Sequence, residues 1–287
     1  MTEAATPARA KRTVTSATVA RTEWLAPDMV RLVLTGPELA NLPELQHTDH
    51  YVKLLFPAPG AAYRWPFDPD ELRETLPREQ WPVTRAYTIR SFDRETLELT
   101  VDFVVHGDEG IAGPWAAAAQ PGDAIGFFGP GGAWGPSPVA DTFLLVGDAA
   151  AIPAIAAALD RLPPHAVAQA FLEVEDATTH VPLPQGDNIA VTWVHHADEP
   201  DRPVGDQLAE VVRAAGLPTG EVHAFVHGNA GMVKDLRRWL FVERGLPRDR
   251  VSISGYWRSG FTDEGWRSVK KEFTAEMERE EQALQSH

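Results

Sequence analysis

One β-prone run in the first third of the chain carries the side chains best suited to chemistry. The run reads WPVTRAYTIRSF and has two arginines, a tyrosine and a threonine at its centre. Side chains alternate between the two faces of a strand, so Arg85 and Tyr87 are predicted to share one face. Ala86, Thr88 and Arg90 are predicted to share the other.

These residue types fit a planar, anionic cofactor. A guanidinium such as that of Arg85 pairs with phosphate oxygens, and an aromatic ring such as that of Tyr87 stacks on another ring. The Thr88 hydroxyl, next to the small Ala86, can form a hydrogen bond with a ring nitrogen and tune its electronics. The pattern therefore favours a flavin. An amphipathic strand with exposed arginines fits the same residues, because short motifs often match by chance.

A second feature follows in residues 102–118, where a strand ends in a glycine-containing turn and an alanine-rich helix. Free backbone N–H groups at such a turn can hold a pyrophosphate, and His106 can stack on an adenine. A plain turn, with a histidine that binds nothing, is the alternative. The candidate contacts of this segment are Asp102, Phe103, Val104, His106, Gly110, Ile111, Ala112, Gly113 and Trp115.

The second half of the chain contains two strand, turn and helix sequences with glycine at the turn. Gly147, Asp148 and Ala149 follow the apolar strand 143–146, and Gly228 and Asn229 follow another strand. Parallel sheets bind ligands at the carboxyl ends of their strands, so both turns are candidates for docking a nicotinamide dinucleotide. The G-x-G-x-x-G fingerprint is absent, which argues against a free-standing dinucleotide-binding domain. Ordinary turns are the alternative at each place.

Two kinds of secondary structure pattern divide the chain. Short β-prone runs with Pro and Gly connectors dominate the first half and predict a sandwich or a barrel. Its strands are expected at 13–20, 29–34, 51–56, 83–92, 97–105 and 124–128, with an ordered insert at 57–82. The second half alternates strands and helices, as an α/β domain with a parallel sheet does. Its strands are expected at 143–146, 167–174, 189–194, 222–226 and 251–254, and its helices at 150–161, 204–215 and 232–244.

The predicted domain boundaries follow from this reading. Residues 1–12 are expected to be disordered, 13–136 to form the β domain and 137–261 the α/β domain. Residues 129–138 are rich in Gly and Pro and are expected to lie outside any strand or helix. Residues 262–287 are expected to form one charged helix with a solvated acidic face at 276–281.

Composition excludes several classes of protein. The 287 residues include 26 Lys and Arg against 41 Asp and Glu, a formal net charge of −15, which argues against nucleic-acid binding. Without cysteine the chain has no disulfide, no thiol nucleophile and no thiolate-held iron–sulfur cluster. Residues 1–12 lack the apolar core of a signal peptide, and the apolar stretch 146–159 is too short to span a bilayer. We expect a cytoplasmic monomer without stable membrane association.

Taken together, these motifs resemble the flavin-dependent siderophore-interacting proteins of the ferredoxin–NADP reductase-like superfamily. The resemblance covers roughly residues 13–273 and rests on four blocks in the family's order. They are the run at 85–90, the segment 102–115, the Gly147-Asp148 turn, and the sequence GYWRSG at 255–260.

The resemblance implies an antiparallel Greek-key β-barrel that binds FAD, then an α/β domain that binds NADH or NADPH, and a C-terminal helix. Arg85, Ala86, Tyr87 and Thr88 would contact the flavin, and the segment from Asp102 to Trp115 the pyrophosphate and adenine. Gly147, Asp148, Ala149, Gly228 and Asn229 would dock the nicotinamide. Two departures concern that docking: Asn229 replaces a common acidic residue, and residues 149–151 are all alanine where hydroxyl groups are usual.

The activity implied is reduction of Fe(III) in a siderophore by electrons from NAD(P)H or from a redox protein. Hard oxygen ligands hold Fe(II) less well than Fe(III), so reduction releases iron. No acid, base or nucleophile is needed, so no catalytic side chain is predicted. Anionic ferric siderophores need a basic docking surface, for which Lys53, Arg90 and Arg258 are the candidates. No metal bound by the protein itself is expected, because the histidines lack ligand spacing.

Two other functions share part of this pattern. A general flavin reductase with another electron acceptor would keep every flavin motif but show no acceleration by siderophores. A siderophore-binding protein without turnover would purify without a flavin.

Overall fold

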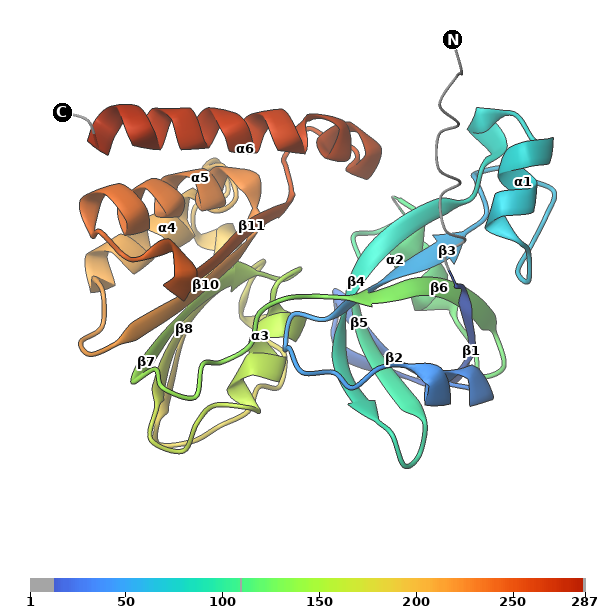
Figure 1. The fold of residues 1–287 in the computed structure, drawn as a ribbon, viewed down its shortest axis with the longest axis horizontal. Coiled ribbons are helices and arrows are strands. Elements are labelled where there is room, and N and C mark those ends of the chain that lie inside the picture. The colour runs from blue at the N-terminus through green and yellow to red at the C-terminus, as the bar shows by residue number, and fades with distance from the viewer. Residues whose placement is uncertain (1–12, 109, 286–287) are drawn as a thin grey trace, which may run out of the picture.

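A computed structural model describes residues 13–108 and 110–285, so the expectation for residues 1–12 concerns residues outside this range. Six antiparallel strands form a closed barrel, and five parallel strands form a sheet beside it (Figure 1). The barrel strands are β1 (Thr15–Ala26), β2 (Met29–Thr35), β3 (Tyr51–Phe56), β4 (Val83–Asp93), β5 (Glu98–Val104) and β6 (Ala124–Gly131). The sheet strands are β7 (Thr142–Asp148), β8 (Val167–Val174), β9 (Ile189–His195), β10 (Val222–Asn229) and β11 (Val251–Trp257).

The barrel has Greek-key connectivity. Its strand order is β1-β2-β5-β4-β3-β6, in which β3, β4 and β5 are consecutive neighbours and β6 returns to pair with β3. Alternate side chains of these strands fill the interior, where Leu32, Leu54, Val101 and Phe127 are fully buried. The predicted barrel is confirmed, and its closure leaves no free strand edge.

The parallel sheet has the order β11-β10-β7-β8-β9. The chain builds one half from β7 to β9 and then returns to β10, so the order reverses between β7 and β10. At such a reversal the carboxyl ends of neighbouring strands leave a crevice where α/β proteins bind ligands. The predicted parallel α/β fold is confirmed.

Within residues 13–108 and 110–285, six α-helices complete the fold. They are α1 (Pro69–Thr75) in the 57–82 insert, α2 (Ala112–Ala118), α3 (Ile152–Leu159), α4 (Asp206–Ala215), α5 (Ala230–Arg238) and α6 (Asp263–Gln285). The helix predicted at 232–244 instead ends at Arg238 and continues as a π-helical turn, Trp239–Glu243. Figure 1 shows α6 along one side of the α/β part, with its first turn toward the barrel. No helix in the described part of the chain is both long and apolar enough to cross a membrane.

One loop prediction was wrong. Residues 129–131 were expected outside any strand, but β6 continues through them to Gly131, which pairs with Tyr51. The register shifts between Tyr51 and Lys53, because Lys53 pairs with Phe128 while Tyr51 pairs with Gly131. This bulge accommodates Pro130, since the extra residues of a bulge need no ladder N–H.

A second prediction failed on α6. Residues 276–281 were expected on a solvated face, but Glu281 is only 3% exposed. Its carboxylate pairs with the Arg237 guanidinium of α5, and its Oε2 lies 2.6 Å from Arg248 Nη2. An acidic side chain tolerates burial when cations accompany it, which sequence periodicity does not reveal.

The barrel and the sheet share an apolar contact. Ala26 and Met29 of the barrel belong to one buried cluster with Phe143 and Phe225 of the sheet. Polar contacts from the end of α3 add to it, because Arg161 donates to main-chain oxygens of barrel residues, including Gln46 at 2.8 Å. These contacts hold the sheet against the barrel.

Candidate functional site

The predicted flavin motif on β4 faces two different surroundings. Tyr87 pairs in register with Val52 and faces the barrel interior, where its ring lies 4.3 Å from the Phe103 ring, centroid to centroid. Ala86 pairs with Lys53 and is exposed on the outer face. Burial raises the pKa of Tyr87 to about 12, so its phenol is neutral at physiological pH. The tyrosine thus belongs to the barrel side of the strand, with one ring face already covered.

Thr88 offers a hydroxyl on the outer face. It is 8% exposed and pairs with Tyr51 across the strands. Within the described residues its hydroxyl has no hydrogen-bond partner. An unpaired hydroxyl on this largely buried side chain is free to form a hydrogen bond with a flavin ring nitrogen. This part of the site fits FAD.

Arg85 meets two carboxylates. Its Nη1 lies 2.6 Å from Glu264 Oε1 and 3.4 Å from Asp263 Oδ2, both in the first turn of α6. The same Nη1 donates to the Thr84 carbonyl at 3.0 Å. Nε and Nη2 form no hydrogen bond with a described residue, so the guanidinium retains donors for an anion.

Two residues predicted at the cofactor have side-chain partners within the protein. Phe103 has no exposed surface. Asp102 is 5% exposed and accepts two hydrogen bonds from Arg31, at 2.7 Å from Nε and 2.9 Å from Nη2. Their side chains take part in packing and in a bidentate ion pair, and the contact of both residues with FAD stays a prediction. Val104, half-buried, packs against the cluster shared with the sheet.

The predicted phosphate segment is compact against the barrel. Ala112 is buried, Ile111 packs on the core, and Trp115 lies 5.5 Å from Phe56, centroid to centroid. A Cβ on Gly113 would stand 3.2 Å from the Val104 oxygen, so this glycine allows close packing on β5. His106 and Gly110 lie in the preceding loop. Contact of this segment with FAD stays a prediction.

At the sheet edge, Asp148 is the central side chain. Its Oδ2 accepts from the Asn229 N–H at 2.7 Å and from Trp257 Nε1 at 2.7 Å, and its Oδ1 accepts from the Ala150 N–H at 3.0 Å. Burial raises the pKa of Asp148, and these donors act in the opposite direction. The structure thus brings together the two predicted nicotinamide turns.

The glycines of these turns have packing reasons of their own. A Cβ on Gly228, whose φ is 134°, would stand 2.5 Å from Asp148 Oδ2. A Cβ on Gly147 would stand 2.4 Å from Ala151 Cβ. Asn229 accepts from the Gly231 N–H at 2.7 Å and so caps α5. Ala149 is half-buried. Nicotinamide contact by these residues stays a prediction.

Tyr256 connects the two halves of the site. It lies on β11 at the sheet edge. Burial is the main cause that raises the pKa of Tyr256, and the charges of Asp49, Asp148 and Tyr51 raise it further. Asp49 and Tyr51 belong to the barrel, and Tyr51 is the register partner of Thr88. Tyr256 also packs against the buried cluster that Ala26 and Met29 of the barrel share with the sheet, so the end of β11 lies against the barrel.

Sequence reasoning missed two residues at this edge. Trp257 was noted only within a motif, although it ends β11 as Asp148 ends β7. Glu173 pairs in register with Asp148, is 3% exposed, and finds no hydrogen-bond partner for either oxygen among the described residues. Burial and the Asp148 charge raise the pKa of Glu173 to about 7. The sequence signal that could have pointed to Glu173 was an acidic residue at the end of an otherwise apolar strand.

The three predicted siderophore cations are in different situations. Arg90 Nη1 lies 2.6 Å from Asp160 Oδ2 at the end of α3, and its side chain is 15% exposed. Lys53 Nζ lies 5.9 Å from the Tyr51 ring centroid. The Arg258 guanidinium lies between the rings of Phe261 and Phe273, at 4.9 and 5.0 Å from their centroids. Among the described residues, no carboxylate pairs with Lys53 or Arg258, whereas Arg90 pairs with Asp160. Contact of all three with a siderophore stays a prediction.

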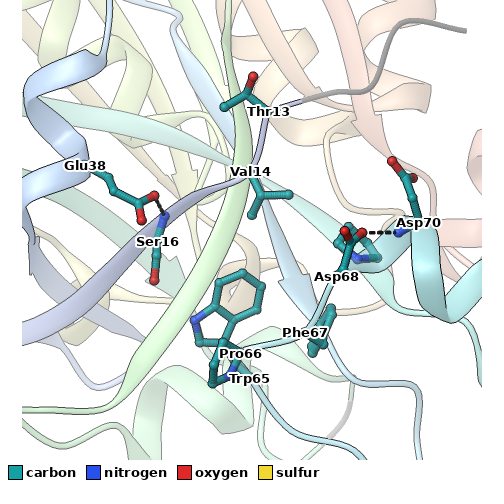
Figure 2. A pocket seen from close by; sticks show the side chains of 10 residues that line it. Thr13, Val14, Ser16, Glu38, Trp65, Pro66, Phe67, Asp68 and Asp70 are labelled. Carbon is teal, nitrogen blue, oxygen red and sulfur yellow. Dashed lines mark hydrogen bonds between the residues drawn. The ribbon is translucent and has the colours of Figure 1, made fainter.

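A hollow of about 750 Å³ lies elsewhere, between the start of β1 and the 57–82 insert. Figure 2 shows the Trp65 and Phe67 side chains lining it, with Val14 opposite. Its carboxylates are engaged, because Asp68 caps α1 and Glu38 accepts from the Ser16 N–H at 2.7 Å. We assign the candidate site by the chemistry at the sheet edge. No group of three or more His, Asp or Glu in residues 13–108 and 110–285 is placed to hold a metal.

Comparison with known proteins shows the family. Residues 18–134 match the siderophore-interacting FAD-binding domain, and residues 140–260 match the siderophore-interacting protein domain. An uncharacterised Mycobacterium tuberculosis protein is 42% identical over 88% of this chain and 93% of its own. Ferric vibriobactin reductase ViuB of Vibrio cholerae is 32% identical over 86% and 90%. The NADPH-dependent ferric-chelate reductase of Escherichia coli is 30% identical over 84% and 92%.

Solved structures agree. A siderophore utilization protein from T. fusca is 35% identical, with a TM-score of 0.74 over 88% of this chain and 95% of that one. The ferredoxin–NADP+ reductase of Plasmodium falciparum, 11% identical with a TM-score of 0.64 over 85% and 96%, shares the fold. This chain belongs to the siderophore-interacting protein family.

Proposed function

We propose that this protein is a flavoenzyme that uses FAD and electrons from NADH or NADPH to reduce Fe(III) held by a siderophore. The observation that carries the proposal is the packing of Tyr256, next to the Asp148-bound Trp257 at the end of β11, against the buried cluster that joins the sheet to the barrel. A cofactor held along β4 would lie beside a nicotinamide docked at the sheet edge. The names of the reductases among the relatives support this reading.

The barrel residues would hold the cofactor. Bound FAD supplies the exchange between two-electron transfer from a nicotinamide and one-electron transfer to iron. Arg85 would pair with a phosphate through its unused donors, and Thr88 would donate to the flavin ring. Tyr87 would stand beside the ring, held in place by Phe103.

The sheet edge would orient the electron donor. Three donors hold the Asp148 carboxylate in one position, so it presents a fixed charge at the crevice where β7 and β10 diverge. Asn229 lies beside it with its side chain committed to capping α5 and to Ser259. Fixed groups of this kind position a ligand without taking part in bond making.

The substrate is expected to dock through charge. Lys53 and Arg258, without carboxylate partners among the described residues, would attract an anionic ferric siderophore to a strongly acidic protein. Hard oxygen ligands bind Fe(II) less firmly than Fe(III), so reduction would release the metal.

The decisive experiment is anaerobic stopped-flow of the photoreduced holoprotein against a panel of ferric siderophores. Reoxidation faster than that of free reduced flavin is expected for at least one of them. Equal rates throughout would contradict the proposal and favour a general flavin reductase. A protein that binds no flavin would instead be a siderophore-binding protein.

Variants separate the two binding functions. Thr88→Val should weaken FAD binding while keeping the fold, and Tyr87→Ala should lose FAD. Lys53→Ala should keep FAD and slow only siderophore reduction. Lys234→Ala is the matched control, because this lysine on α5 pairs with Glu280 on α6, away from the barrel. Unchanged FAD affinity in both Thr88→Val and Tyr87→Ala would contradict the placement of the flavin.

A further inference from the structure

The first turn of α6 rests on the strand that carries the flavin motif. Glu264 Oε1 lies 2.6 Å from Arg85 Nη1, and Asp263 Oδ2 lies 3.4 Å from the same atom. Arg267, one turn later, donates to Thr84 Oγ1 at 3.2 Å and pairs with Asp263 at 2.9 Å. Two carboxylates therefore already pair with Arg85, the cation that we propose for binding the FAD phosphate.

The rest of α6 holds this turn in place. Trp266 is 2% exposed and donates from Nε1 to the Gly255 oxygen at 3.3 Å. Lys270 Nζ lies 3.0 Å from Ser254 Oγ, and the buried Glu281 ties the far end to α5. These contacts fix the helix along the α/β part, and its first turn therefore lies next to Arg85.

The two partners of the ion pair differ in exposure. The Arg85 side chain is 17% exposed, whereas that of Glu264 is 57% exposed. Glu264 can therefore rotate into water while Arg85 stays, and an exposed ion pair costs little to break. Asp263 is less exposed, at 31%, and Arg267 retains it.

We propose that Glu264, aided by Asp263, competes with the FAD phosphate for Arg85, so that the C-terminal helix sets how tightly the flavin is held. This inference rests on the proposed role of Arg85 in FAD binding. A phosphate binds a guanidinium best when it faces two donors, and carboxylates beside it repel its charge. FAD would bind by displacing Glu264 into solvent, and its release would let the carboxylate return.

The test is a titration of the full-length, deflavinated protein with FAD, followed by flavin fluorescence. Glu264→Gln should lower the Kd for FAD by about two- to fivefold, in the range of an exposed ion pair. Asp263→Asn combined with Glu264→Gln should lower it further. Glu272→Gln is the matched control, since Glu272 is an exposed α6 glutamate with no ion pair among the described residues. Thermal unfolding confirms that each variant is folded.

A double-mutant cycle with Arg85→Gln decides between competition and general electrostatics. If Glu264 acts on Arg85, the gain from Glu264→Gln disappears in the Arg85→Gln background. A gain that persists there, or that Glu272→Gln reproduces, overturns the inference, as does an unchanged or weaker affinity of Glu264→Gln in the wild-type background. If Arg85→Gln alone leaves the Kd unchanged, the proposed flavin role of Arg85 fails. If the wild-type protein takes up no FAD, the proposed function fails.

A second measurement does not depend on any variant. Hydrogen exchange of the main-chain amides at 264–268 should become faster when FAD is added to the deflavinated protein, because the first turn of α6 loses the Glu264–Arg85 ion pair, one of the contacts that anchor it. Slower or unchanged exchange there overturns the inference.

Discussion

Trp257 donates its indole N–H to Asp148 at 2.7 Å, which joins the end of β11 to the end of β7 across the intervening strand β10. The Asn229 N–H, at the end of β10, donates to the same oxygen. Three strands that are far apart in sequence thus share one buried carboxylate at the edge where a nicotinamide is expected.

Trp257→Phe should therefore affect both stability and donor binding. Removing one donor from a buried carboxylate costs about 1–3 kcal/mol in the free energy of unfolding. We expect that loss in urea denaturation, and a higher Kd for NADH or NADPH in anaerobic binding to the flavoprotein. Trp24→Phe is the control, because Trp24 is 51% exposed on the barrel. Equal behaviour of the two variants would deny Trp257 a role.

The buried Glu281 predicts a large effect on α6. It pairs with Arg237 and Arg248, and its removal would leave the buried Arg237 without its main partner. Glu281→Ala should lower the free energy of unfolding by about 3–5 kcal/mol. Glu280→Ala, which breaks only the exposed pair with Lys234, should cost less than about 1 kcal/mol. Comparable losses in both would contradict the placement of Glu281.

Arg90 and Asp160 should behave as an ion pair between the barrel and α3. The Asp160 side chain is 47% exposed, so the coupling between Arg90→Gln and Asp160→Asn in a double-mutant cycle should be about 0.5–1 kcal/mol. Arg90→Gln should also change siderophore reduction much less than Lys53→Ala does. A selective loss of siderophore reduction in Arg90→Gln, without coupling to Asp160, would show that Arg90 takes part in siderophore docking rather than in the ion pair.

Glu173 predicts a pH dependence of stability. Its pKa is about 7 in the folded protein, against an ordinary value of 4.5, so between these values the folded state retains a proton that the unfolded chain has lost. Its contribution to stability is therefore complete below pH 4.5 and falls as the pH rises to 7. Glu173→Gln should flatten this slope and exceed the wild type in stability above pH 7.

Urea denaturation at pH 5 and pH 8 measures that slope. Glu175→Gln, at an exposed position two residues later, should leave it unchanged. A wild-type slope that survives in Glu173→Gln would assign the titration to another group.

The strands and helices were largely predictable. Alternation in the barrel strands and continuous apolar runs such as that before Gly147 are local signals, since each depends on which face of one strand is buried. The bulge at Pro130 was not predictable, because it depends on the register between β6 and β3. The burial of Glu281 likewise depends on Arg237 and Arg248, which reach it from other elements.

At the candidate site, the run around Arg85 and Tyr87 and the turn at Asp148 were visible in the order and type of the residues alone. The sequence thereby determined the two-part architecture, the family and the segments where cofactors are expected. The tertiary structure decided the partners: Phe103 behind Tyr87, Arg31 on Asp102, Asp160 on Arg90 and Glu264 on Arg85. Each partner comes from another segment, and contacts between distant segments depend on how whole elements pack, which no local pattern records.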